Sequence, residues 1–360
     1  MLSPFSFPSV AVVGAGMAGS ACAASLARAG WQVTVFDKSR SVGGRMSARR
    51  AAWADTQGEP QRTEFDHGAQ HFSARHPRFR AAMLRAESTG CLVRWQPRVH
   101  ARWPAPVQRS SWVPVPNMPA LCRQLLGGVS VRLEHKVQRL QRHADGWHVV
   151  LDGGDSSGPF DQVMLAMPPA QAAVLLAGHH DAWADTLAAW PMHPCWALMA
   201  ATPDVDWPWD AAEPATGPFA WVVRNDRKPG RSAPTGCATW VAQATAAWSA
   251  AHLEDDAQSV AEALRTALQA LLPGGRPVDW QHSSVHRWRY AAPAAAATDG
   301  RDCWWDAALQ LGVCGDFLGS GDVESAWHSG DELADTVAAC LDDAPGTPPR
   351  VDMPAVAQLA

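Results

Sequence analysis

Glycines near the start of the chain have the spacing of a phosphate-binding turn. Gly14, Gly16 and Gly19 follow directly after the short apolar run Val10–Val13. In a strand–turn–helix unit, the first glycine makes the tight turn, the second lets the backbone approach a pyrophosphate, and the third lets the helix pack closely on the sheet. The N–H groups at the helix start would face the phosphates. The pattern therefore predicts a dinucleotide site at this turn.

An acidic residue and a second glycine pair follow the turn. Asp37 ends the next apolar run, at about the 20-residue spacing expected of an acid that binds ribose hydroxyls. Gly43 and Gly44 precede Arg45, and together they offer a pliable backbone and a fixed cation to a phosphate. Taken alone, this stretch is better interpreted as an ordinary turn with a solvated arginine. Placed after Asp37, it resembles the signature of FAD-dependent oxidoreductases of the amine-oxidase type.

A second strong pattern lies near the carboxyl end. The apolar run Leu311–Cys314 leads into Gly315 and Asp316, and after a glycine-rich turn we expect a helix to begin near Asp322. Asp316 could accept a hydrogen bond from a ribityl hydroxyl. The positive potential at the helix start would stabilise negative charge on a reduced flavin ring. The alternative interpretation is a plain strand–loop–helix in which Asp322 caps the helix.

A third candidate segment, Phe65–Phe72, combines small and polar residues. Gly68 and Ala69 give a stretch with little side chain that could lie against a planar ring. Gln70 and His71 could present hydrogen-bond donors to a flavin or to a substrate. On chemistry alone, a turn with a satisfied histidine is the better interpretation.

Several segments together resemble the bacterial renalase-like branch of the amine-oxidase-type flavoproteins. The matches run from Val10 to about Cys340, nearly the whole chain. Pro114 and Asn117 depart from the resemblance, because glycine is expected at such positions, so we expect the loop from Trp112 to Met118 to be shaped differently here. The matching segments are Phe36–Arg40, Val42–Ser47, Asp66–Arg75, Trp112–Met118, Arg227–Arg231 and His286–Ala291.

The resemblance implies which residues form the site. Val137 also fits on physical grounds, because the backbone of a strand can hydrogen-bond an adenine edge. The implied contacts to non-covalent FAD are Gly14, Gly16, Met17, Ala18, Gly19, Asp37, Lys38, Gly44, Arg45, Met46, Gly68, Ala69, Gln70, Val137, Gly315, Asp316, Asp322, Val323 and Glu324. The implied lining of a substrate pocket over the flavin is Gln70, His71, Phe72, Ser73, Trp112, Val113, Arg289 and Tyr290.

The order of the expected elements predicts an α/β fold. A Rossmann-like FAD-binding domain carries an inserted α+β substrate domain on an antiparallel sheet. Within these, we expect residues 97–119 to be irregular and 253–272 to be one long helix. The expected boundaries are 1–75, 127–170 and 305–342 for the FAD-binding domain, 76–126 and 171–304 for the substrate domain, and 343–360 for a disordered tail.

The composition argues against several classes of protein. The net charge is −5 and no run is rich in lysine and arginine, so we expect no nucleic-acid partner. No CxxC pair occurs, and we expect no zinc site. We expect no membrane span, because the apolar start of the chain carries the glycine turn. Scattered free cysteines are typical of a reducing cytoplasm.

The positions of the lysines bear on one feature of amine oxidases. These enzymes often have a lysine that binds a water molecule beside the flavin. The chain has only Lys38, Lys136 and Lys228. The first two adjoin the expected adenosine end of the site. Lys228 lies in a Pro-Gly loop and is interpreted as a solvated cation. We therefore expect the lysine–water feature to be missing.

The resemblance implies an oxidase with a small-molecule substrate. It would take hydride from non-standard dihydro isomers of NAD(P)H onto the flavin, with molecular oxygen as acceptor and H2O2 as product. Such a donor needs no protein base, because loss of hydride restores aromaticity. The alternatives are a flavin amine oxidase or desaturase of an apolar substrate, and an FAD-binding redox sensor without catalysis.

Overall fold

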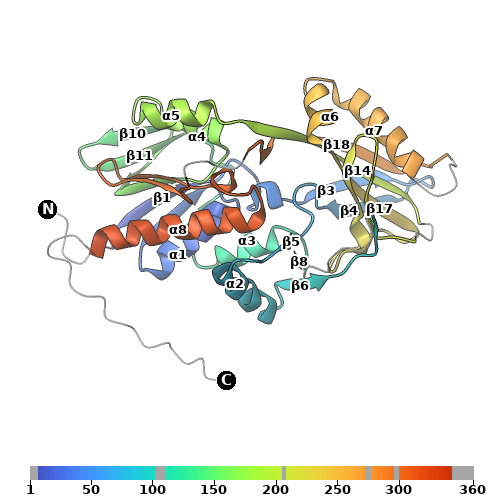
Figure 1. Ribbon diagram of the computed structural model, residues 1–360, viewed down its shortest axis with the longest axis horizontal. Helices are drawn as coiled ribbons and strands as arrows, with labels where there is room; N and C mark the ends of the chain where they lie inside the picture. Colours follow the sequence, from blue (N-terminus) through green and yellow to red (C-terminus); the bar gives the residue numbers. More distant parts are fainter. Residues whose placement is uncertain (1–6, 102–110, 205–207, 272–276, 296–299, 343–360) are drawn as a thin grey trace.

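A parallel sheet assembled from distant parts of the chain forms one half of the molecule (Figure 1). The structure, a computed structural model, describes residues 7–101, 111–204, 208–271, 277–295 and 300–342. Neighbouring strands of this sheet are parallel, except that the edge strand β19 runs antiparallel to β20. In spatial order the strands are β19 (Trp304–Asp306), β20 (Leu311–Val313), β13 (Gln162–Leu165), β1 (Ser9–Val13), β2 (Gln32–Phe36) and β9 (Ser130–Arg132).

Both faces of the parallel sheet are covered, which explains the unbroken apolar run of β1. On one face, α1 (Met17–Arg28) and α8 (Val323–Asp342) lie side by side. Their backbones touch, because a Cβ at Gly330 would lie 2.0 Å from the carbonyl oxygen of Ala18. The other face is covered by β10 (Val137–His143), β11 (Gly146–Leu151), β12 (Ser156–Phe160), α4 (Pro169–Leu176) and α5 (Asp181–Ala188).

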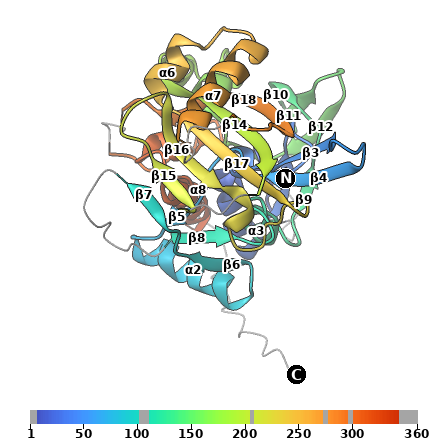
Figure 2. The same cartoon turned by 90° about the vertical axis from the view of Figure 1, so that its right-hand side faces the viewer.

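A second six-stranded sheet forms the other half of the molecule (Figure 2). Its neighbouring strands are antiparallel, except that β7 runs parallel to β15 at one edge. We refer to it as the antiparallel sheet. In spatial order its strands are β18 (His282–Pro293), β14 (Met192–Pro203), β17 (Cys237–Ala244), β16 (Phe219–Arg224), β15 (Ala211–Glu213) and β7 (Val99–Ala101).

Two helices, α6 (Ala246–Ala251) and α7 (Ala257–Leu271), cover one face of the antiparallel sheet. The prediction of one long helix over 253–272 is wrong at its start. Asp256 ends the connection between the helices, because its carboxylate accepts the N–H groups of Gln258 and Ser259. This side-chain cap fixes the start of α7 after Asp256.

The remaining elements pack against helices α1 and α8 or against the antiparallel sheet. The prediction of an irregular segment over 97–119 is wrong in part, because 99–101 and 111–114 form strands; residues 102–110 lie outside the described residues. The elements are the hairpin β3 (Arg49–Ala54) and β4 (Pro60–Phe65), the small sheet β5 (Phe72–Ser73), β8 (Ser111–Pro114) and β6 (Leu92–Trp95), and the helices α2 (Pro77–Ser88) and α3 (Ala120–Leu125). Three single-turn 3₁₀ helices cover Gly44–Met46, Asn225–Arg227 and Asp316–Leu318.

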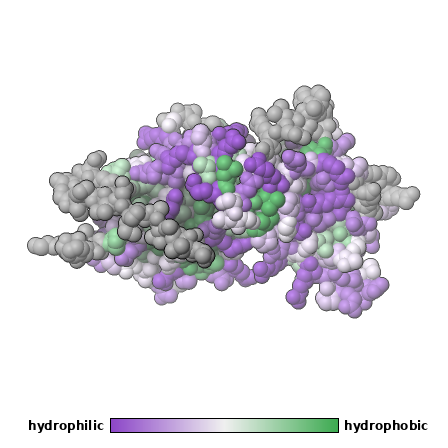
Figure 3. Space-filling view, turned by 90° about the horizontal axis from the view of Figure 1, so that it is seen from below, coloured by the Kyte–Doolittle hydropathy of each residue, from purple (hydrophilic) through white to green (hydrophobic). Residues whose placement is uncertain are grey.

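The arrangement confirms the predicted fold class, a Rossmann-like sheet joined to an α+β half with an antiparallel sheet. The domain boundaries remain a prediction, and the tail 343–360 lies outside the described residues. Within the described part of the chain, each helix is too short or too polar to cross a membrane. One face of the molecule is mainly hydrophilic, with hydrophobic residues gathered in a small area near its middle (Figure 3).

Candidate active site

A long cavity of about 1740 Å³ runs between the parallel sheet and the antiparallel sheet. At one end, which we call the turn end, its walls come from the β1–α1 turn and from residues around Asp37 and Val137. At the other, which we call the loop end, its walls come from the segment 67–73 and from β14, β17 and β18. The cavity therefore joins the two halves of the fold, a common location for cofactor and substrate sites.

The glycine turn forms the floor of the turn end. Gly14 has a φ of +115°, and its N–H donates to the carbonyl of Phe36 at 2.8 Å. A Cβ at Gly14 would lie 2.2 Å from the oxygen of Ala166, so only glycine fits. Helix α1 begins at Met17, directly after Gly16, with no side-chain cap and no acid in its first turn. Its exposed N–H groups and positive potential fit a pyrophosphate group.

Asp37 lies beside this turn and also lines the cavity. One carboxylate oxygen accepts the N–H of Ala15 at 2.7 Å, and the other accepts the N–H of Ser39 at 2.8 Å. Each oxygen keeps a lone pair, so the oriented carboxylate is suited to accept ribose hydroxyls. Val137 and Lys38 line the same end, and the lysine Nζ donates to Gln171 at 3.2 Å.

An ion pair joins the two glycine-rich motifs in the middle of the cavity. Arg45 donates to both carboxylate oxygens of Asp316, at 2.7 and 2.5 Å, and to the carbonyl of Ala291 at 3.1 Å. Asp316 is only 3% exposed. The sequence suggested that Arg45 binds a phosphate, but the structure commits two of its N–H groups to a carboxylate. The pair still lines the cavity, where it orients both residues.

The Gly68–Ala69 segment forms a smooth wall at the loop end. The N–H of Ala69 donates to the carbonyl of Arg45 at 2.8 Å, and a Cβ at Gly68 would lie 1.9 Å from that oxygen. Gln243 on β17 donates to the carbonyl of Gly68 at 2.7 Å. These bonds hold a backbone surface with almost no side chain against the cavity. Its shape fits a planar ring.

His71 projects from the same segment toward the cavity wall. Its ring lies 5.5 Å from Trp95 and 5.4 Å from Trp221, between two strands. Burial lowers the pKa of His71 to about 4, with a smaller contribution from the charge of Lys228. The imidazole is therefore neutral at pH 7 and is a weak base.

Some of the predicted substrate residues do not line the cavity. Gln70 is 5% exposed and donates to the carbonyls of Asp66 and Gly68. Trp112 and Val113 on β8 are buried in the core behind it. Gly19 also lies outside the lining, where a Cβ would meet the oxygen of Gly14 at 1.9 Å. Its role is the close packing of helix on turn that the spacing predicts.

The loop with the two departures from the expected glycines is likewise set back from the cavity. The carbonyl of Pro114 accepts a hydrogen bond from Arg231 at 2.6 Å. Asn117 donates to Glu64 at 2.7 Å and accepts from Arg123 at 2.6 Å. The backbone of Pro114 and the side chain of Asn117 therefore take part in the support behind the wall.

The start of α8 reaches the cavity, but its acids are already engaged. Asp322 accepts the N–H of Ser325 at 2.8 Å, which makes it the helix cap. Glu324 accepts the backbone N–H groups of Arg75 and His76, at 2.7 and 2.6 Å. Capping was the alternative interpretation of Asp322, and the structure supports it. Val323 and Glu324 line the cavity beside Asp316.

Strand β18 presents one face to the cavity and the other to α6 and α7. His286, Trp288 and Tyr290 alternate along it and share a face, as strand geometry requires. The His286 ring lies 4.7 Å from that of His67, and burial together with Arg49 lowers the pKa of His286 to about 4. Arg289 also borders the cavity, but its guanidinium turns to the other side of the strand and pairs with Glu254 at 2.6 and 2.9 Å.

The structure thus brings most of the predicted residues together around one cavity. Those that line it are Gly14, Gly16, Met17, Ala18, Asp37, Lys38, Gly44, Arg45, Met46, Gly68, Ala69, His71, Phe72, Ser73, Val137, Arg289, Tyr290, Gly315, Asp316, Asp322, Val323 and Glu324. Those that do not are Gly19, Gln70, Trp112 and Val113.

Lys228 was interpreted from the sequence as a solvated cation, and this is wrong. Its side chain is 0% exposed, and its Nζ lies 2.7 Å from a carboxylate oxygen of Asp66. Arg231 contacts the same oxygen through its Nε at 2.8 Å. No sequence pattern indicates this cluster, although Arg227–Arg231 and Asp66–Arg75 are both among the segments that carry the resemblance.

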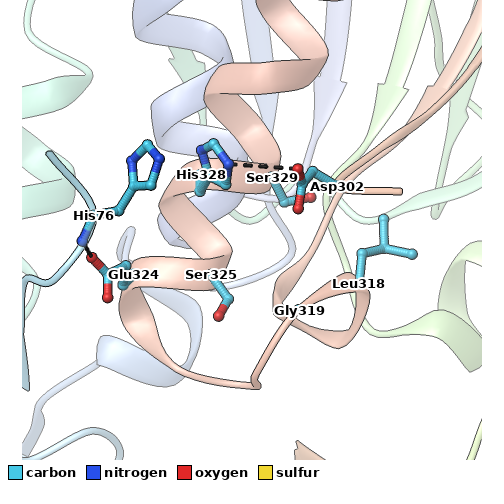
Figure 4. A pocket seen from close by; sticks show the side chains of 8 residues that line it. All are labelled: His76, Asp302, Leu318, Gly319, Glu324, Ser325, His328 and Ser329. Carbon is cyan, nitrogen blue, oxygen red and sulfur yellow. Dashed lines mark hydrogen bonds and ion pairs between the residues drawn. The ribbon is translucent and has the colours of Figure 1, made fainter. Parts of the chain in front are cut away.

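A separate small pocket of about 110 Å³ lies between α8, the loop before it and His76 (Figure 4). The rings of His76 and His328 lie 4.7 Å apart, and His328 lies 3.5 Å from Asp302. Among the described residues, no three histidine, cysteine or acidic side chains are grouped so that they could hold a metal ion. The pocket is small and does not include the predicted cofactor glycines.

Solved oxidases share this fold over nearly their whole length. Cyclohexylamine oxidase from Brevibacterium oxydans is similar with a TM-score of 0.67 and 14% identity, covering 94% of this chain and 100% of that chain. A putrescine oxidase variant has a TM-score of 0.65 at 14% identity, with 93% and 100% coverage. An oxidoreductase from Methanosarcina mazei has a TM-score of 0.64 at 13% identity, with 93% and 100% coverage. What this chain shares with these structures is the fold, a Rossmann-like half joined to a half with an antiparallel sheet.

Matches of the sequence to family models identify the family of the chain. Residues 106–338 match the flavin containing amine oxidoreductases, and residues 12–86 match the NAD(P)-binding Rossmann-like domain. The chain belongs to the flavin containing amine oxidoreductase family. It is a flavin-dependent oxidoreductase with FAD as its cofactor, and the uncapped start of α1 and the smooth Gly68–Ala69 wall fit that group.

Curated relatives match only parts of the chain. One is the tRNA 5-methylaminomethyl-2-thiouridine biosynthesis bifunctional protein MnmC of Magnetococcus marinus, 28% identical over 197 residues, which are 44% of this chain and 29% of that protein. Another is the 4,4'-diapophytoene desaturase of Staphylococcus haemolyticus, 63% identical over 38 residues, 11% of this chain and 8% of that protein. The chain spans less than a third of the length of either relative.

Proposed function

We propose that this flavoprotein is a renalase-like oxidase. Its donors would be non-standard dihydro isomers of NAD(P)H, which it returns to NAD(P)+, and molecular oxygen would accept the electrons to give H2O2. The residues lining the cavity that were predicted to bind FAD would hold the cofactor, from Asp37 at the turn end to the Gly68–Ala69 wall. When bound, FAD supplies the hydride-accepting position.

The placement of the lysines carries this proposal. Lys38 and Lys136 line the cavity at the turn end, next to Asp37 and Val137. Lys228 is buried and bonded to Asp66, away from the cavity lining. No described lysine side chain therefore faces the loop end, where an amine oxidase of this type often has one. A dihydropyridine donor has no need of such a residue.

The loop end can orient a donor without taking a proton from it. His67 and His71 line it, and burial is the main reason that the pKa of each is lowered to about 4. Neutral imidazoles and the Gln243 amide can hydrogen-bond a polar ring substituent. Trp288 offers a flat apolar face beside them. The role that this chain has in the reaction is then to align the donor and exclude water.

The alternative is a flavin amine oxidase or a desaturase of an apolar substrate. The family match and the similarity to cyclohexylamine oxidase favour an amine, since that neighbour is named for one. An amine must be neutral before it gives up hydride, and the neutral histidines at the loop end would not protonate it. The two proposals differ in the donor and share the cofactor site.

Anaerobic mixing of the FAD-loaded protein with a panel of donors tests the proposal. We expect the dihydro isomers to bleach the flavin fast, ordinary NAD(P)H and amines to do so slowly, and air to restore the colour with formation of H2O2. Fast bleaching by amines alone would establish the alternative. Bleaching by dithionite but by no donor would point to a redox sensor.

A matched pair of variants locates the donor. Ala220 lines the loop end on an exposed face of β16, so Ala220→Trp should block the donor while FAD and its reduction by dithionite are retained. Val93→Trp on β6, at a residue 38% exposed and outside the cavity lining, should behave like the natural protein. Equal donor rates in the two variants would place the donor elsewhere.

A further inference from the structure

Three charged side chains share one buried position behind the cavity wall. Asp66 accepts from Lys228 Nζ at 2.7 Å and from Arg231 Nε at 2.8 Å through the same oxygen. Its other oxygen accepts the N–H of Met118 at 3.2 Å. The side chains of Lys228, Arg231 and Asp66 are 0%, 3% and 1% exposed. We call these three residues the buried cluster.

The buried cluster carries one more positive charge than negative. Lys228 and Arg231 hold the pKa of Asp66 below its usual value although burial alone would raise it, so the carboxylate is ionised. Glu64, a further acid whose charge acts on Arg231, is paired with Arg50 at 2.7 Å. Burial lowers the pKa of Lys228 to about 8, with a smaller lowering from Arg231, while Asp66 opposes both. At pH 7 a net positive charge therefore remains in a region that water screens poorly.

Hydrogen bonds connect the buried cluster to the wall of the cavity. Lys228 Nζ donates to Gln70 Oε1 at 3.3 Å, and Gln70 Nε2 donates to the carbonyl of Gly68 at 2.9 Å. Gly68 and Ala69 line the cavity directly. The charge of Lys228 also lowers the pKa of His71, which lies on the same wall. The cluster thus lies one layer of residues behind the surface where we place the flavin ring.

We propose that Lys228 is a positioning residue that fixes the Gly68–His71 wall through Gln70 and, with Arg231, raises the reduction potential of the flavin held there. Positive charge favours a reduced ring, which gains negative charge. Lys228 acts through the wall and does not touch the substrate. The inference rests on the proposed position of the flavin ring, and it does not depend on which donor the enzyme uses.

The midpoint potential of the bound FAD is the decisive measurement. It is read by titration with dithionite against a reference dye, so it stays interpretable even if the proposed donor is wrong. We expect Lys228→Met, which keeps the length of the side chain and removes its charge, to lower the potential by about 30 mV, a tenfold change in the equilibrium constant of a two-electron couple. Arg85→Met removes one charge from an exposed position on α2 and should leave the potential unchanged.

A second measurement needs no variant and decides the matter if Lys228→Met does not fold. Lys228 faces Asp66, Arg231 and Gln70, with His71 nearby. Raising the pH through about 8 should neutralise it, so the potential of the natural protein should fall more steeply there than below pH 7. A potential in Lys228→Met equal to that of Arg85→Met, or a slope without any steepening near pH 8, would overturn the proposal.

Discussion

The turn end and the loop end of the cavity, where we propose that the cofactor binds, are built by different means. At the turn end the surface is formed by backbone. Gly14, Gly16 and the uncapped start of α1 leave backbone N–H groups available to a ligand. At the loop end a backbone wall is supported from behind by Gln70, which in turn accepts a hydrogen bond from Lys228 of the buried cluster. A backbone site needs glycine at fixed spacings, whereas a side-chain support needs partners that the fold alone brings together.

The largest effect on FAD binding should come from a side chain added at Gly14, in the turn end of the cavity. Gly14→Val adds a Cβ that would lie 2.2 Å from the oxygen of Ala166, at a φ of +115° that branched side chains rarely adopt. We expect the purified protein to lose its FAD and to unfold at a lower temperature, with backbone strain alone costing about 1–3 kcal/mol. Flavin absorbance and thermal unfolding measure the two effects.

Gly58→Val is the matched control for this change. Gly58 also has a positive φ, of +83°, but a Cβ there meets nothing within 4 Å. The control should keep its FAD. Its free energy of unfolding should fall only by the backbone strain, about 1–2 kcal/mol. If both variants lose FAD equally, the close contact at Gly14 is not what shapes the site.

Removing the carboxylate of the buried cluster tests the loop end. Asp66→Asn leaves Lys228 and Arg231 buried without a counter-charge, and breaking such a pair costs about 3–5 kcal/mol. Urea unfolding of the FAD-free protein should show this loss. Asp335→Asn removes an acid 2.7 Å from Arg78 at a side chain that is 55% exposed, and should cost less than about 1 kcal/mol. Equal losses would mean that the cluster is no more buried in solution than a surface pair.

The same contrast explains what the sequence could predict. The glycine turn, Asp37 and the strand and helix order around them follow from local patterns, and the structure places them as expected. Lys228 could not be placed, because its partner Asp66 lies 162 residues away and nothing local marks it as buried. Gln70 was expected to face the cavity, but its amide is taken by backbone carbonyls that the fold supplies.

Acid should destabilise the loop end. Burial is the main reason that the pKa values of His67 and His71 are lowered to about 4 from 6.5. Between these values the unfolded chain binds protons that the folded protein does not, so stability falls as the pH falls from 6.5 to 4. Each histidine would lower the free energy of unfolding by up to about 3 kcal/mol.

Urea unfolding at pH 7 and pH 4.5 measures this loss. His71→Phe replaces the imidazole by an apolar ring of similar shape between Trp95 and Trp221, and its Nδ1 has no hydrogen-bond partner to lose. The variant should lose less stability than the natural protein between the two pH values. A loss of the same size in both would show that His71 stays accessible to protons in the folded state.

The smallest effect should come from the ion pair where the two ends meet. Arg45→Lys keeps the charge but loses the two parallel N–H···O bonds to Asp316, which lysine cannot reproduce. We expect weaker FAD binding by about 1–2 kcal/mol, measured as the Kd of the FAD-free protein for FAD. Arg94→Lys makes the same change at the exposed bidentate pair with Glu87, at 2.9 and 3.2 Å, and should leave the Kd unchanged. If Arg45→Lys also leaves the Kd unchanged, the two glycine motifs hold the cofactor independently. The two ends are then connected by the backbone contact of Gly68 and Ala69 with the Arg45 carbonyl.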